Sequence, residues 1–109
     1  AEMKHGPIAL IEPGIPTVVL AAQGEIRDKM MSNAHEIRAR GGSIIAVTEE
    51  GDASVAALAR HVIPIPKTLD PLVPILAVIP LQLFAYHIAV ERGCDVDKPR
   101  NLAKSVTVE

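Results

Sequence analysis

Residues 17–22, TVVLAA, decide the fold, and residues 44–48, IIAVT, repeat their pattern. Both are short, uninterrupted apolar runs rich in β-branched residues, which is typical of strands buried on both faces of a parallel sheet. The turn signal PGIP at residues 13–16 precedes the first run. The sequence therefore predicts two buried strands, one on each side of residues 23–43.

Residues 25–40, between these strands, change to the period of a helix. A glutamate stands near the start and arginines near the end, in agreement with the helix dipole. Gly41 and Gly42 are expected to end the helix. Four apolar residues fall on one face of it: Ile26, Met30, Ala34 and Ile37.

A third strand is predicted at residues 61–65, after a short helix at residues 53–58. Pro64 places that strand at an edge of the sheet or near a strand end, because proline lacks the N–H that a central strand needs. Strands that alternate with helices across short loops predict an α/β fold, a parallel doubly wound sheet flanked by helices.

Residues 71–90 carry no formal charge and are long enough to cross a membrane. Three prolines and the polar residues Gln82, Tyr86 and His87 favour instead a core helix that covers one face of the sheet. Pro80 should kink this helix or restart it. Tyr86 and His87 are expected to be buried and hydrogen-bonded.

The composition narrows the class of protein. The chain has 109 residues, enough for one domain, and a net charge of −2 with no basic cluster, which argues against nucleic acid as a partner. The single cysteine, Cys94, excludes an internal disulfide and fits the cytoplasm; we interpret it as structural or incidental. Residues 49–52 form an acidic loop that we expect to be solvated, and His35 and His61 lack assignable partners. We therefore expect neither a metal nor a cofactor.

The C-terminal residues 97–109 contain a candidate nucleophile. They read DKPRNLAKSVTVE, a stiffened turn followed by an apolar patch that contains Lys104 and an alternating SVTV. A lysine shielded from water there would act as an amine nucleophile toward a carbonyl. On chemistry alone, a solvated charge remains the commoner interpretation of such a lysine.

This C-terminal stretch resembles that of the glucosamine-6-phosphate synthase family, also called glutamine:fructose-6-phosphate amidotransferase (isomerizing). The motifs KHGP at residues 4–7, PLQL at 80–83, AYH at 85–87 and DVD at 95–97 occur in the order and at about the spacing of that family. The resemblance implies a fragment of the isomerase half. Residues 1–96 would be most of the second sugar isomerase (SIS) subdomain, and residues 97–109 a catalytic tail. The implied fold is a flavodoxin-like three-layer sheet that lacks its first strand and helix.

The resemblance also implies the site. Lys104 would form a Schiff base with the open-chain ketone of fructose 6-phosphate, while Leu102 and the Ala103 backbone close over the sugar. His5 would help to open the sugar ring from the neighbouring subunit, which implies a homodimer. Arg100 is expected to anchor the tail, with phosphate binding as the alternative, and Glu109 to contact a cation elsewhere in the enzyme.

The function so implied is that of the parent enzyme, which converts fructose 6-phosphate and ammonia from glutamine to glucosamine 6-phosphate. The fragment alone is expected to be inactive, because the glutaminase domain, the phosphate-binding loop and an upstream carboxylate are missing. It is expected to be marginally stable unless it dimerises or pairs with the remainder, because a sheet without its first strand exposes an unpaired edge. One alternative is a non-catalytic SIS module that binds a sugar phosphate in a sensor or regulator. Another is an SIS enzyme that removes sugar from a fructosyl-amine, which the ending KSVTVE disfavours.

Overall fold

The computed structural model describes residues 2–22 and 24–98. The chain divides into two units, Ala1–Ala77 and Val78–Glu109, and one helix begins in the first unit and continues in the second. The elements in chain order are η1 (Met3–His5), η2 (Pro7–Leu10), β1 (Pro16–Leu20), α1 (Gly24–Ala39), β2 (Ser43–Glu49), α2 (Ala53–Ala56), β3 (His61–Ile65), η3 (Asp70–Leu72) and α3 (Val73–Glu91).

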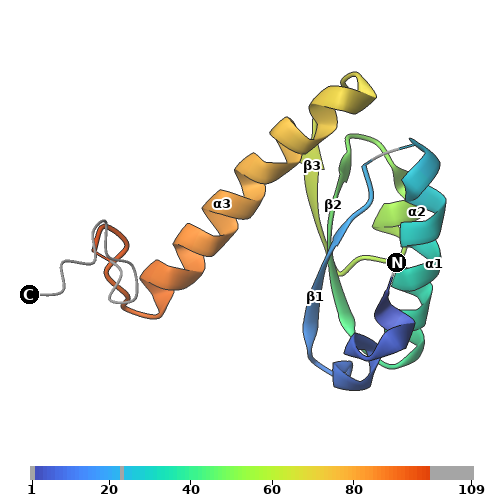
Figure 1. Ribbon diagram of the computed structural model, residues 1–109, viewed down its shortest axis with the longest axis horizontal. Coiled ribbons are helices and arrows are strands. Elements are labelled where there is room, and N and C mark those ends of the chain that lie inside the picture. The colour runs from blue at the N-terminus through green and yellow to red at the C-terminus, as the bar shows by residue number, and fades with distance from the viewer. Residues whose placement is uncertain (1, 23, 99–109) are drawn as a thin grey trace, which may run out of the picture. The chain divides into compact units, whose positions relative to one another are not determined.

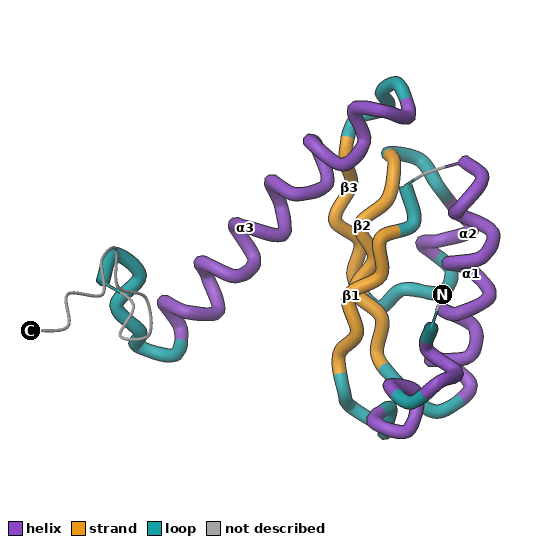
Figure 2. Tube along the Cα trace, viewed as in Figure 1, coloured by secondary structure: helices purple, strands orange, loops and turns teal. Residues whose placement is uncertain are grey.

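The three strands of the first unit, orange in Figure 2, form a parallel sheet in the order β1-β2-β3. Val19 of β1 pairs with Ala46 of β2, and Ala46 pairs with Val62 of β3. The predicted parallel α/β fold is confirmed. Among the described strands β3 lies at an edge of the sheet, as Pro64 indicated.

Helices α1 and α2 lie on the same face of this sheet (Figure 1), and the core of the unit lies beneath them. The core is entirely aliphatic, as a composition almost without aromatic residues requires. Its buried cluster consists of Val19, Ala21, Ala34, Ile37, Ile44, Ala46 and Val55. Two residues of the predicted helical face, Ala34 and Ile37, are thus in the core, and Met30 packs against it.

Ile26, on the same helical face, is 55% exposed and lies near Leu20 of β1. One expectation about burial in this unit is wrong. The strand β1 is not buried on both faces: Val18 and Leu20 point to the face opposite Val19 and are exposed. The cause is that α1 and α2 both cover the same face, so they protect only one set of alternating residues.

Helix α3 spans the boundary between the two units. Val73 and Ala77, in the part that belongs to the first unit, are buried. The expectation that the helix covers one face of the sheet stays a prediction. Tyr86 and His87, predicted to be buried, are exposed in the second unit; their ring centroids lie 5.4 Å apart in an edge-to-face contact. The helix also runs through Pro80 without restarting.

Within the described residues, Asp70–Glu91 is the one helix whose length and apolar composition suffice to cross a membrane. The core helix of a larger soluble protein passes the same test.

Candidate functional site

His5 ends the short helix η1, and its side chain is 76% exposed. Its Nε2 lies 3.6 Å from a carboxylate oxygen of Glu2, which is also exposed. Gly6 follows with φ at 150°, a conformation that side chains rarely adopt, and Pro7 then begins η2. The backbone thus turns sharply behind His5, while its imidazole faces the solvent.

The segment that carries His5 is held on both sides. Met3 packs against the core, and the ammonium of Lys4 lies 3.0 Å from the Glu36 carboxylate in α1. Glu36 is close to the C-terminal end of α1, which runs from the carboxyl end of β1 to the amino end of β2. His5 therefore lies on the side of the sheet where the parallel strands begin.

A polar cluster occupies the opposite side, where the strands end. Arg27 in the first turn of α1 donates from Nε and Nη2 to the two carboxylate oxygens of Asp52, each at 2.8 Å. Arg27 also donates to the hydroxyl of Ser54. Asp52 caps α2 by accepting from the backbone N–H groups of Ser54 and Val55. The cluster joins the start of α1 to the start of α2.

The same carboxylate is held in its charged form. Burial by itself raises the pKa of Asp52, but hydrogen bonds from Ser54, Arg27 and the Val55 backbone, together with the Arg27 charge, outweigh it and lower the pKa to about 2. Thr48, only 1% exposed, donates to the Ala21 carbonyl at 3.1 Å and lies 3.5 Å from Asp52. The expectation of a solvated acidic loop is wrong for Asp52, because Arg27 and α2 enclose its carboxylate.

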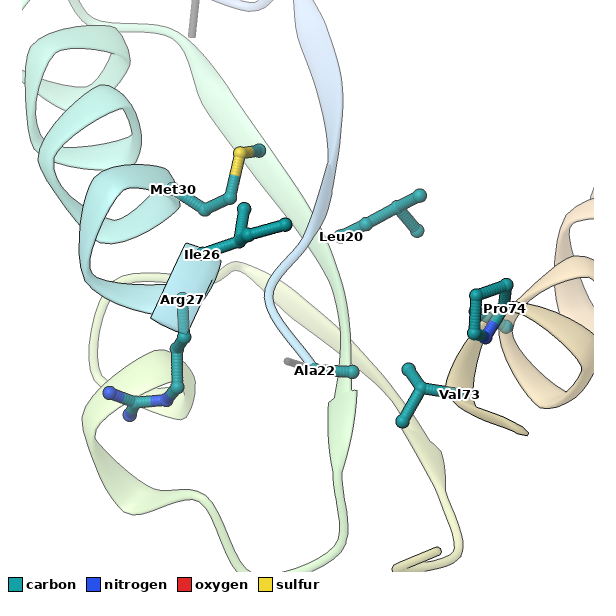
Figure 3. Close-up of a pocket in the computed structure, with 8 residues that line it drawn as sticks. Leu20, Ala22, Ile26, Arg27, Met30, Val73 and Pro74 are labelled. Carbon is teal, nitrogen blue, oxygen red and sulfur yellow. The ribbon is translucent and has the colours of Figure 1, made fainter. Parts of the chain in front are cut away.

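An apolar pocket of about 130 Å³ lies beside β1 (Figure 3). Ile26 and Met30 point toward Leu20 from α1, whereas the guanidinium of Arg27 points away from them. The residues that line the pocket are Leu20, Ala22, Ile26, Arg27, Met30, Val73, Pro74 and Ala77. None of the apolar groups can transfer a proton, so this pocket offers packing surface only.

The described residues bring no complete reaction centre together. Lys104, Ala103 and Leu102 lie outside the described residues, as do Arg100 and Glu109. Cys94, His35 and His61 are exposed. No group of three or more His, Cys, Asp or Glu side chains suited to a metal occurs in the described part of the chain. Of the predicted site residues, only His5 can be placed.

Two pairings escaped the sequence reasoning. Arg27 and Asp52 are 25 positions apart, and nothing in a single sequence connects them. Asp52 did carry a local signal, because an aspartate followed by ASVA is a typical helix N-cap. The pairing of Lys4 with Glu36 left no such signal.

Residues 1–92 match the SIS domain family. The chain belongs to this family. The chain is 58% identical over 108 residues to the glutamine–fructose-6-phosphate aminotransferase [isomerizing] of Thermus thermophilus, a match that covers 99% of this chain and 18% of that protein. It is 54% identical over 109 residues to the enzyme of the same name from Bacteroides thetaiotaomicron, again covering 18% of that protein.

A solved structure agrees with these relatives. The C-terminal domain of glucosamine-fructose-6-phosphate aminotransferase from Francisella tularensis superposes on the SIS domain with a TM-score of 0.75 and 35% identity, over 87% of this chain and 27% of that one. The resemblance seen in the sequence motifs is therefore confirmed along almost the whole chain. The chain spans 18% of the length of the curated relatives that it matches.

Proposed function

We propose that this SIS domain is the C-terminal part of the isomerase half of a glutamine–fructose-6-phosphate aminotransferase (isomerizing). The observation that carries the proposal is the identity of 53% to 58% to enzymes of that name over 99% or more of the chain. The complete protein would then bind fructose 6-phosphate, receive ammonia from its own glutaminase domain, and release glucosamine 6-phosphate in the cytoplasm.

In this proposal Lys104 supplies the nucleophile. Its neutral amine adds to the C2 ketone of the open-chain sugar, and loss of water leaves an imine. A neutral amine requires that the ammonium form be disfavoured, which burial beneath the C-terminal tail and the bound sugar provides. Leu102 and the Ala103 backbone lie next to Lys104 in sequence and are proposed to enclose the sugar. The tail begins at residue 97 in this assignment.

His5 is proposed to move the proton between the ring oxygen and the hydroxyl as the cyclic sugar opens. An imidazole titrates near neutral pH and can both accept and donate that proton. The exposure of its side chain, 76%, supports the proposal, since the ring is free to contact substrate.

The position of His5 also supports a homodimer in which the site is shared. Open α/β sheets bind ligands at the carboxyl ends of their strands. His5 lies at the amino ends, beside the last turns of α1, so it is remote from the carboxyl-end crevice of its own sheet. An exposed histidine on that side is available to the site of a neighbouring subunit.

The experiment that tests the Lys104 assignment is chemical trapping. The full-length enzyme is incubated with fructose 6-phosphate and reduced with borohydride, and the modified peptide is located by mass. The expected adduct is on Lys104 and disappears in Lys104→Arg, while the nearby control Lys98→Arg retains it. An adduct on another lysine, or none, would overturn the assignment.

A second experiment tests His5. In the full-length enzyme, His5→Ala should slow turnover of the cyclic sugar by at least about a hundredfold more than turnover of an open-chain analogue, the size of a lost general acid–base step. Equal slowing of both substrates would indicate a packing role. Sedimentation of the intact isomerase half should show two subunits, and an active monomer would contradict a shared site.

A further inference from the structure

We propose that Lys4 and Glu36 form a clamp that positions His5 for proton transfer, with Glu36 as a positioning residue on α1. The inference rests on the proposed role of His5, and it adds that the ion pair between Lys4 and Glu36 holds His5 in position. The motif KHGP thereby gains a function for its lysine, which touches no substrate in this proposal.

The first support is the environment of the Glu36 carboxylate. Its side chain is 24% exposed, whereas that of Lys4 is 68% exposed. One oxygen, Oε1, lies 3.0 Å from Lys4, and the other, Oε2, is buried without a hydrogen-bond partner among the described residues. A charged oxygen buried in this way is costly, so the carboxylate depends on Lys4 for its compensation. The pair is therefore more than a contact between two solvated charges.

The second support is the way in which η1 is held. Met3 packs on the core, Lys4 is tied to α1, and Gly6 turns the chain at a φ of 150°. Among the described residues, the ion-pair partner of the His5 imidazole is the exposed Glu2, and an exposed pair of this kind contributes little to stability. The direction in which the His5 side chain projects is thus set by its backbone. The ion pair between Lys4 and Glu36 holds that backbone against α1.

The clamp predicts a specific kinetic defect. A general acid must lie within hydrogen-bond reach of the proton it transfers, and a displacement of about 1 Å costs up to about a hundredfold in rate. Release of η1 from α1 should therefore slow the opening of the cyclic sugar. It should leave the reaction of an open-chain sugar with Lys104 intact.

The test uses the full-length enzyme and the ratio of kcat for cyclic fructose 6-phosphate to kcat for an open-chain analogue. Lys4→Met and Glu36→Gln should each lower this ratio about tenfold, and the double variant should lower it no further, because both changes break one contact. Lys4→Arg, which retains the ion pair, should keep the ratio. The matched control Lys29→Met removes an exposed cation from α1 and should leave the ratio unchanged.

The outcomes separate positioning from mere stability. Lys4→Met leaves the half-buried Glu36 carboxylate uncompensated, whereas Glu36→Gln leaves only the solvated Lys4 ammonium. If the pair were purely structural, Lys4→Met would therefore lower the thermal stability more than Glu36→Gln. Neither variant would then change the ratio of the two kcat values. Additive losses in the double variant, or a loss in Lys4→Arg as large as in Lys4→Met, would also overturn the clamp. Borohydride trapping of the open-chain analogue on Lys104 checks that each variant remains folded.

The same data distinguish the clamp from the function on which it rests. Should His5→Ala slow both substrates equally, the role of His5 in ring opening is refuted. Should His5→Ala be selective while Lys4→Met and Glu36→Gln keep the wild-type ratio, the role of His5 stands and the clamp alone is refuted.

Discussion

Arg27 and Asp52 meet through two parallel hydrogen bonds of 2.8 Å, although 25 positions separate them in the chain. The planar guanidinium matches the two carboxylate oxygens, which makes such a pair directional as well as attractive. Because Arg27 lies in the first turn of α1 and Asp52 caps α2, the pair fixes the starts of both helices where the strands end. The pair is thus a two-bond polar connection between two helices that are separate in the sequence.

Arg27→Met should lower the free energy of unfolding by about 2 kcal/mol, because it leaves the Asp52 carboxylate, 14% exposed, without its cation. Arg27→Lys should have a smaller effect, since lysine supplies the positive charge but cannot make the two parallel hydrogen bonds of a guanidinium. Urea denaturation measures both. The control Arg60→Met removes an exposed arginine and should change stability by less than about 0.5 kcal/mol. A loss for Arg27→Met no greater than that of the control would contradict the structural role of the pair.

Acid should weaken the same connection in a defined pH window. The pKa of Asp52 is lowered to about 2 in the folded chain, whereas an aspartate in an unfolded chain titrates near about 3.9. A depressed pKa stabilises the fold above the unfolded value, and this contribution, about 2 kcal/mol, is lost as the pH falls from about 4 to about 2. Asp52→Asn should remove this part of the pH dependence. Denaturation at several pH values measures the free energy of unfolding of both proteins. The prediction would be wrong if this free energy fell equally in Asp52→Asn and in the wild type below pH about 4.

Gly42 is predicted to tolerate no side chain. A Cβ at this position would lie 2.7 Å from the Cγ2 atoms of both Ile11 and Ile37, whose β-branched side chains adapt poorly. Gly42→Ala should therefore cost about 2 kcal/mol of unfolding free energy. Gly24→Ala is the matched control, because its Cβ would meet nothing nearer than Asp70 at 3.9 Å and alanine favours a helix. Equal denaturation midpoints for the two variants would rule out the steric argument.

The sequence predicted those parts of the fold that depend on local pattern. Apolar runs located β1 and β2, and helical period located α1, because burial leaves its mark at fixed intervals along each element. Whether a residue is buried also depends on which other element covers it, and the spacing of apolar residues along one element does not contain that information. Ile26 and Tyr86 satisfied the pattern of a buried face and are nevertheless exposed. The motif KHGP pointed to His5, but only the structure shows Lys4 paired with Glu36 behind it.

Helix α3 carries an apolar stripe that the described residues of the second unit do not cover. Ile79, Leu83, Tyr86 and Val90 recur at intervals of three or four residues and are each about half exposed, at 50%, 54%, 50% and 47%. Residues at this spacing share one face of a helix. A continuous apolar surface of this kind is typical of an interface that other protein covers.

The 109-residue chain alone should therefore associate and bind a hydrophobic dye, and Leu83→Lys should reduce both effects. In the full-length enzyme the same substitution should act in the opposite direction and destabilise the fold by about 2 kcal/mol, because a covered leucine loses its burial there. Gln82→Lys adds the same charge on the same helix without removing apolar area, and should leave both proteins unchanged. Sedimentation velocity, dye fluorescence and urea denaturation provide the measurements. If the full-length Leu83→Lys variant were as stable as the full-length Gln82→Lys variant, the stripe would be exposed in the complete enzyme and the prediction would be wrong.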